Sequence, residues 1–298
     1  MRAIKVTENE MDQRLDRFLT KYLNKATKTN IFKLIRKKRI RVNGSRTEEK
    51  YFLQLGDEIQ IHLHEDAIDE MIRPIEKIEA QEINLDIVYE DDDILIVNKP
   101  VGLLTHPDSK EYKNTLSSKV QVYLKHLTTR TFRPASIQRL DKNTSGLVIF
   151  GKNYASLKKY NEYMRERKIG KFYLAVVSGK PKDSGEVKGY LTKNEATNKI
   201  SISKNDSDEA KFAHTKYKLL RTNGKYSLLE VELLTGRTHQ IRGSLAYIGH
   251  PIVGDVKYGG ERLNRQNQLL HAYRVVIEDK EYMKSSKEIE AFLKQQNI

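Results

Sequence analysis

Hydrophobic residues recur at two different spacings along this chain, and each change of spacing marks a change of element. Residues 15–23 and 31–35 follow the spacing of amphipathic helices. Residues 40–44 predict a short strand that ends in an Asn-Gly turn, a dipeptide that favours hairpins. Residues 55–63 alternate like a half-buried strand. Residues 1–65 are therefore predicted to form a small α/β unit.

The pattern beyond this unit predicts a linker and then a larger domain. Residues 66–84 are polar and acidic without clear periodicity, so we expect them to form the linker. The later pattern predicts strands at 86–90, 94–98 and 147–150, helices at 115–127 and 154–167, mainly strands over 171–234, and helices at 239–248 and 285–295. Runs of strands with interspersed helices indicate an α+β domain with a mixed sheet over residues 85–298.

Composition narrows the possible functions. The 298 residues suffice for about two domains. Lys and Arg number 54 against 40 Asp and Glu, a net charge of +14. Such an excess favours polyanionic partners, with nucleic acid ahead of membranes because no apolar anchor is present. The absence of cysteine excludes disulfides and thiolate chemistry. With no signal peptide and no long apolar stretch, we expect a cytoplasmic protein without a membrane partner.

One segment carries more chemical information than any other. The triplet Arg139-Leu140-Asp141 leads into the turn-forming residues 143–146, and an apolar strand follows directly. A carboxylate is thus predicted on a stiff turn at the end of a sheet strand, beside a permanent cation. Catalytic residues are often placed in this way, although a lone Arg-Leu-Asp triplet is also typical of a surface ion pair.

A second charged segment lies where a strand gives way to a helix. Arg237, His239 and Arg242 follow the strand-like residues 226–233, and helical spacing begins near Thr238, a residue suited to cap the helix. Because the helix dipole disfavours cations at this end, three of them indicate an anionic partner, either a carboxylate or a phosphate.

Five segments, in the same order, resemble the RluA/RluC/RluD family of RNA pseudouridine synthases. They are Ile94-Leu-Ile-Val-Asn-Lys-Pro-Val-Gly102, Arg139-Leu-Asp141 with Thr144-Ser-Gly146, Lys171-Phe-Tyr-Leu-Ala175, Gly236-Arg-Thr-His-Gln-Ile-Arg242 and Ile248-Gly-His-Pro-Ile-Val-Gly-Asp255. The resemblance implies a long, curved, mostly antiparallel sheet with a cleft across its middle. It also implies an enzyme that detaches uracil from its ribose, rotates it and rejoins it through carbon.

The resemblance assigns a role to each site residue. It implies that Asp141 is the nucleophile, that Arg242 is its ion-pair partner, and that Tyr173 provides an aromatic face for a uridine flipped out of its helix. A guanidinium keeps a carboxylate ionised and oriented. The expected RNA contacts in this domain are Arg139, which would fill the gap left by the base or grip its phosphate, Arg237, His239, and Lys99, for which a structural role is the alternative.

The N-terminal unit resembles the RNA-binding module of ribosomal small-subunit protein four. Basic residues crowd its second helix and the following turn, and we expect them to contact RNA: Lys33, Arg36, Lys37, Lys38, Arg39 and Arg41. A charge run on a helix is otherwise typical of a solvated face.

Two departures from the family pattern leave alternatives open. Gln138 replaces the family's usual His before the triplet, and Ser244 stands where many relatives carry a second His. Large-subunit ribosomal RNA is the expected substrate. The alternatives are transfer RNA modification and a non-catalytic RNA-binding assembly factor, for which Gln138 is the supporting feature. The isomerisation is redox-neutral and the histidines lack ligand spacing, so we expect no metal and no cofactor. A monomer is the default expectation.

Overall fold

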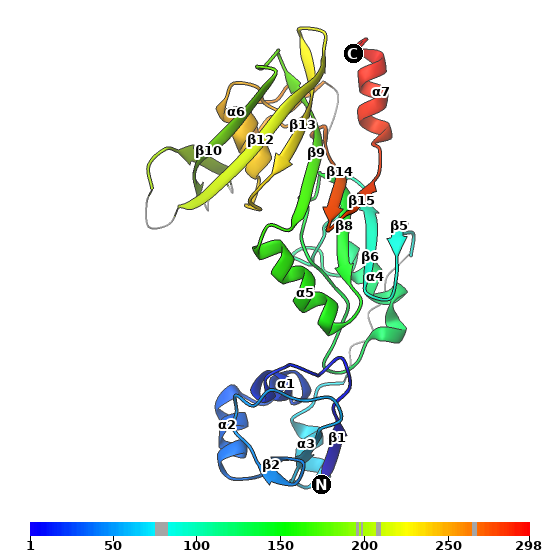
Figure 1. Cartoon of the computed structure of the whole chain (residues 1–298), viewed down its shortest axis with the longest axis vertical. Coiled ribbons are helices and arrows are strands. Elements are labelled where there is room, and N and C mark those ends of the chain that lie inside the picture. The colour runs from blue at the N-terminus through cyan, green and yellow to red at the C-terminus, as the bar shows by residue number, and fades with distance from the viewer. Residues whose placement is uncertain (75–82, 195–196, 198, 207–209, 264–266) are drawn as a thin grey trace.

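The elements of the N-terminal part form a small domain at one end of the molecule (Figure 1). The computed structural model describes residues 1–74, 83–194, 197, 199–206, 210–263 and 267–298. The N-terminal elements are β1 (Arg2–Lys5), α1 (Leu15–Tyr22), α2 (Lys28–Arg36), β2 (Ile40–Val42), β3 (Ser45–Arg46), β4 (Glu58–Ile61) and α3 (Glu65–Glu70). The antiparallel strands pair in the order β1-β4-β2-β3. Asn43 and Gly44 join β2 to β3 with φ of 51° and 75°, as a tight hairpin turn requires.

The core of this domain extends further along the chain than the sequence pattern predicts. Ile68 of α3 and the following Ile72 are buried in the same cluster as Leu15 and Phe18. The expected start of the linker at residue 66 is therefore wrong. A helix of six residues is too short to show clear periodicity, so its apolar stripe is easily missed. Residues 75–82 of the expected linker lie outside the described residues.

The larger part is an α+β domain built on one mixed sheet (Figure 1). Its strands are β5 (Asp86–Glu90), β6 (Ile94–Lys99), β7 (Ala135–Ser136), β8 (Ser145–Gly151), β9 (Ile169–Ser178), β10 (Ser184–Asn194), β11 (Lys199–Ser203), β12 (Lys211–Thr222), β13 (Tyr226–Leu233), β14 (Leu270–Ile277) and β15 (Lys280–Met283). Its helices are α4 (Leu116–Tyr123), α5 (Tyr154–Arg165), α6 (Gln240–Tyr247) and α7 (Lys287–Gln295), with short 3₁₀ turns η1 (Lys125–Leu127) and η2 (Val256–Tyr258). Among the described residues the strands run in the order β11-β10-β12-β13-β9-β14-β8-β6-β5.

The middle of the sheet is where β8 and β14 pair in parallel, while the other described pairings are antiparallel. Gly146 lies opposite Ala272 with φ of 116°, and a Cβ at this glycine would lie 2.3 Å from the Ala272 carbonyl oxygen. Only glycine allows the two strands to approach so closely. Because β8 begins four residues after Asp141, this pairing brings the carboxylate to the centre of the sheet.

Helix α6 begins differently from the expectation. Its N-cap is His239, in the left-handed conformation with φ of 51°, and no side chain caps the helix, so the prediction of a Thr238 cap is wrong. The Gln240 carboxamide oxygen instead accepts hydrogen bonds from the Arg237 N–H and the Thr235 hydroxyl. These contacts replace a capping side chain and fix the turn that leads into the helix.

The two domains touch through the loop before β7 and the start of α5. The Thr131 hydroxyl donates to the Glu10 carboxylate, and the Tyr154 N–H donates to Asn9 Oδ1 at 3.2 Å. The Arg130 guanidinium lies 5.7 Å from the centre of the Tyr22 ring. Within the described part of the chain, no helix combines the length and apolar character needed to cross a membrane.

Candidate active site

A cavity of about 570 Å³ opens at the centre of the sheet, where the charged segments of the sequence meet. It is lined by the turn containing Arg139 and Asp141, by Tyr173 of β9 and by residues 233–242. Its volume is typical of a small-molecule pocket and suffices for a nucleoside. Segments about 100 residues apart in the chain therefore share one wall.

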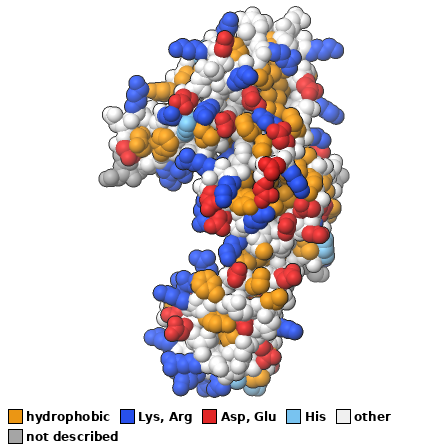
Figure 2. Space-filling view, viewed as in Figure 1, with side chains coloured by type: hydrophobic (Ala, Val, Ile, Leu, Met, Phe, Trp, Pro, Cys, Tyr) orange, Lys and Arg blue, Asp and Glu red, His pale blue; other side chains and the backbone are white. Residues whose placement is uncertain are grey.

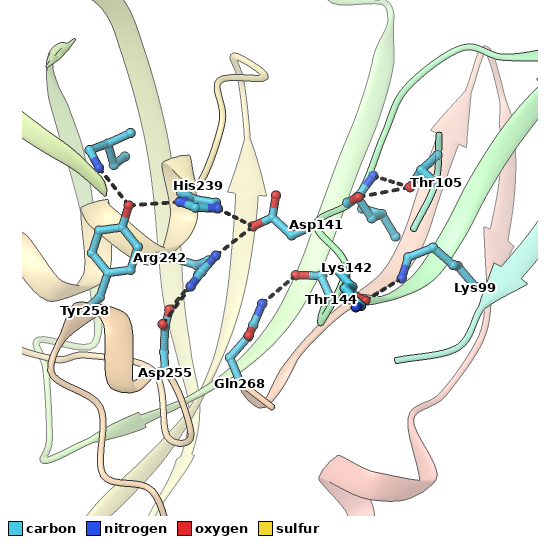
Figure 3. A network of polar contacts seen from close by, with 12 residues as sticks. Lys99, Thr105, Asp141, Lys142, Thr144, His239, Arg242, Asp255, Tyr258 and Gln268 are labelled. Atoms are coloured by element: carbon cyan, nitrogen blue, oxygen red, sulfur yellow. Dashed lines mark hydrogen bonds and ion pairs between the residues drawn. The ribbon is translucent and has the colours of Figure 1, made fainter. Parts of the chain in front are cut away.

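Arg242, in the wall of this cavity, binds two carboxylates (Figure 3). Its Nη1 donates to Asp141 Oδ2 at 3.1 Å, while its Nε and Nη2 donate to the two oxygens of Asp255 at 2.7 and 2.8 Å. The Asp255 side chain is 1% exposed, whereas that of Asp141 is 25% exposed. The two-pronged bond to Asp255 fixes the plane of the guanidinium. An N–H of Nη1 orients Asp141, which alone of the two carboxylates faces the cavity.

The charge of Arg242 is secured by this arrangement. Burial by itself would lower the pKa of Arg242, but the hydrogen bonds and charge of Asp255, together with Asp141, raise it above its ordinary value. The Tyr258 ring also lies 5.0 Å from the guanidinium carbon. A permanent cation is therefore held beside Asp141.

His239 lies between Tyr258 and Asp141 (Figure 3). Its Nδ1 is 3.1 Å from the Tyr258 hydroxyl, and its Nε2 is 3.7 Å from Asp141 Oδ2. Burial, with Arg242 and Lys257, lowers the pKa of His239, although Asp141 and Asp255 act in the opposite direction. The imidazole is thus held within the site, next to the carboxylate.

The turn that carries Asp141 is anchored on both sides. The Thr105 hydroxyl bonds both the N–H and the carbonyl of Leu140, and the Gly102 N–H donates to the Lys142 carbonyl. On the other side, Gln268 donates to the Thr144 hydroxyl at 3.1 Å. Backbone anchors on either side of Asp141 limit how far its carboxylate can move.

Lys99 belongs to this anchoring system, which corrects the expectation of an RNA contact. Its side chain is fully buried, and Nζ donates to the carbonyls of Pro100, Leu103 and Lys142 at 2.7–3.0 Å. Figure 3 shows the bond to Lys142. Burial lowers the pKa of Lys99 to about 7, and Asp141 opposes that shift. Three carbonyl acceptors match the three hydrogens of an ammonium group. The residue is therefore out of reach of RNA and supports the Asp141 turn.

The two departures from the family pattern have structural roles. Gln138 donates to the Leu147 carbonyl at 3.4 Å and accepts from the Ile149 N–H at 3.3 Å, so it continues the hydrogen bonding of β8. The Ser244 hydroxyl is buried 3.2 Å from that of Thr215. Gln138 also lines the cavity beside Arg139 and Asp141, whereas Ser244 does not.

Tyr173 and Phe172 lie on opposite faces of β9, as strand alternation predicts. Tyr173 is buried in the cavity wall, and burial raises its pKa, with a smaller effect of Asp141. Phe172 instead stacks on the Arg274 guanidinium, 3.8 Å from its carbon. Tyr173 is therefore the ring that faces Asp141.

The remaining expected RNA contacts are open to solvent. Arg139 and Arg237 are exposed at the cavity rim, and Arg237 Nε also donates to the Phe212 carbonyl. The basic residues of the N-terminal domain that are expected to contact RNA are exposed, and none of these six forms an ion pair with a described residue: Lys33, Arg36, Lys37, Lys38, Arg39 and Arg41. Figure 2 shows Lys and Arg side chains gathered along the outer edge of this domain.

Sequence reasoning missed Asp255 as the main partner of Arg242, and it missed Tyr258. Both lie in the Gly254–Gly260 turn, and only Asp255 belongs to a segment that carries the family resemblance. Asp255 directly follows a glycine and comes 13 residues after Arg242, and this proximity is the signal that could have suggested their pairing. In the described part of the chain, no cluster of three His, Asp or Glu side chains could hold a metal ion.

Comparisons with known proteins agree with this geometry. Residues 93–247 match the model of the RNA pseudouridylate synthase family, and residues 13–59 match the S4 domain. The chain is 36% identical to ribosomal large subunit pseudouridine synthase C of Rickettsia bellii, over 91% of each chain. It is 31% identical to ribosomal large subunit pseudouridine synthase D of Borreliella burgdorferi, over 93% of this chain and 85% of that protein. A solved human structure, RNA pseudouridylate synthase domain containing 4, has a similar fold, with a TM-score of 0.59 at 21% identity over 71% of this chain and 92% of the human one.

Proposed function

The chain belongs to the RNA pseudouridylate synthase family, and we propose that it isomerises specific uridines of large-subunit ribosomal RNA, with Asp141 as the nucleophile. The observation that carries this proposal is the ion pair of Asp141 with Arg242 in the wall of a nucleoside-sized cavity. A carboxylate that is paired with a permanent cation and faces a pocket is equipped for nucleophilic attack.

The reaction needs little beyond such a group. The bond from uracil N1 to the ribose C1′ breaks, a bond from C5 to C1′ forms, C5 loses a proton and N1 gains one. Asp141 would attack the sugar or the ring, or remove a sugar proton, while uracil turns within the cavity. Arg242 stays charged and holds the attacking carboxylate in its orientation throughout.

A uridine must leave its helix to reach Asp141. Enzymes that act on bases flip them into a pocket at a cost of a few kcal/mol and stack them on an apolar or aromatic face. Tyr173 lies in the cavity wall and can offer that face. Arg139, exposed at the rim, can fill the vacated position in the RNA helix or grip the displaced phosphate.

Ribosomal RNA as the substrate rests on two further observations. Relatives at 31–36% identity carry the name of ribosomal large subunit pseudouridine synthase. The N-terminal domain adds an exposed basic surface away from the cavity, which suits a large structured RNA.

The proposal is tested by mapping pseudouridine in total RNA from cells with and without this gene. We expect one or a few large-subunit positions to lose the modification, and to regain it when wild-type protein is supplied. Loss confined to transfer RNA would redirect the substrate assignment. An unchanged map, together with ribosome assembly defects, would favour a non-catalytic assembly factor.

The basic surface of the N-terminal domain is expected to contribute phosphate contacts. Replacing Arg36 and Arg39 with glutamine should reduce the slope of log affinity against log salt concentration by about 2, since each lost phosphate contact removes about one unit. Both side chains are exposed and unpaired, so the fold should be unaffected. Titrations of a ribosomal RNA fragment at several salt concentrations measure the slope.

The matched control removes the charges of two exposed lysines of α7, Lys287 and Lys294. Helix α7 lies far from the N-terminal domain (Figure 1). The net charge changes equally, but we expect the slope to stay within about half a unit of the wild-type value. Equal slopes for the two double variants would show that the N-terminal arginines act only through net charge and make no specific phosphate contacts.

A further inference from the structure

Three cations outside the recognised site lie along one side of the same cavity. Arg165 ends α5, Arg167 follows it, and Lys171 lies in β9. Lys171 is 9% exposed, whereas the two arginines are exposed. Since Lys171 and Tyr173 are two residues apart on a strand, their side chains lie on the same face, roughly 7 Å from each other.

These cations have no carboxylate partner among the described residues. The contact of the Lys171 ammonium is to Met164 Sδ at 3.4 Å, and a thioether is a weak acceptor. Neighbouring lysines of the same region are paired: Lys158 with Asp12, Lys159 with Glu278 and Lys168 with Glu166. The unpaired cations are thus those that face the cavity.

Such an arrangement is unfavourable in the free protein. Burial lowers the pKa of Lys171, and the nearby charge of Arg167 lowers it further. The dipole of α5 favours Arg165 and Arg167 near its C-terminus, but it offers no account of a buried lysine on the next strand. An anion placed among the three groups would offset both the desolvation of Lys171 and the mutual repulsion.

We propose that Arg165, Arg167 and Lys171 form a subsite for a phosphodiester group of the RNA backbone, next to the uridine in the cavity. The proposal rests on the proposed function, because it is the entry of a uridine that brings its backbone to this wall. Arginine forks match phosphate oxygens, and the spacing of Lys171 from Tyr173 is comparable to that of a base from its own phosphate. The subsite would hold the backbone while Tyr173 receives the base.

The test measures the affinity of the whole chain for a fluorescently labelled five-nucleotide oligouridylate and compares the wild type with variants. Lys171→Met is expected to weaken binding about 10-fold and to lower the salt slope by about 0.7, the value for one phosphate of a single strand. Lys171→Arg keeps the charge and should retain most of the affinity. Lys168→Met is the matched control: the residue is exposed and paired with Glu166, and its loss should change affinity less than about 2-fold.

A second variant guards against misfolding of Lys171→Met. Arg167→Gln alters an exposed side chain and should weaken binding about 5-fold without lowering the melting temperature. Equal affinities for Arg167→Gln, Lys171→Met and the Lys168→Met control would overturn the subsite. Wild-type turnover on ribosomal RNA is measured separately. If the wild type is inactive but its binding of oligouridylate still depends on Arg167 and Lys171, the proposed function is rejected and the subsite is retained.

Discussion

Replacing Asp141 with asparagine is expected to abolish isomerisation while leaving RNA binding close to normal. The amide has the shape of the carboxylate and can still accept a hydrogen bond from Arg242, so the cavity should keep its form. What is lost is the negative charge and the nucleophile. A charge interaction of about 4 kcal/mol, as expected near a protein surface, corresponds to roughly 1,000-fold in rate, and loss of the nucleophile adds to this. Single-turnover assays on ribosomal RNA measure the rate.

The affinity of this variant for RNA is the internal control. We expect the dissociation constant to stay within about 3-fold of the wild-type value, since Asp141 faces the RNA as a like charge and contributes no phosphate contact. Asp183→Asn, at an exposed position away from the cavity, should leave both rate and affinity unchanged. Substantial residual turnover by Asp141→Asn would remove Asp141 from the role of nucleophile.

Arg242→Met should cost both stability and activity, for separable reasons. Asp255 would be left buried without its cation, and breaking a buried pair in this way typically costs about 3–5 kcal/mol of unfolding free energy. Asp141 would lose the cation that orients it. Urea denaturation and single-turnover assays measure the two losses.

The double variant Arg242→Met with Asp255→Asn separates these effects. Removing the stranded charge should recover most of the lost stability, because a neutral amide is far cheaper to bury than a carboxylate. Activity should stay as low as in the single variant, since Asp141 still lacks its counter-cation. Recovery of activity along with stability would show that Arg242 serves only to neutralise Asp255.

Local sequence patterns were sufficient for much of the architecture. Alternation implies that Tyr173 and Phe172 lie on opposite faces of β9, because strand side chains have a fixed period of two. The Asn43-Gly44 dipeptide predicted its hairpin, because both residues tolerate positive φ. The charged segments around Asp141 and Arg242 were identifiable because their turn residues and cations are close together in the chain. The catalytic roles of these residues stay predictions.

Partnerships between distant segments were decided by the tertiary structure. Arg242 reaches Asp141, 101 residues earlier, because β14 is inserted between β9 and β8 and brings the two halves of the sheet together. The fold surrounds the Lys99 ammonium with three carbonyls, which decides for the structural role against an RNA contact. Residue types and local spacing determined which groups this protein possesses. Long-range strand pairing decides which carboxylate is buried, which cation is bonded within the protein and which cation faces the cavity. A one-dimensional pattern does not contain that information.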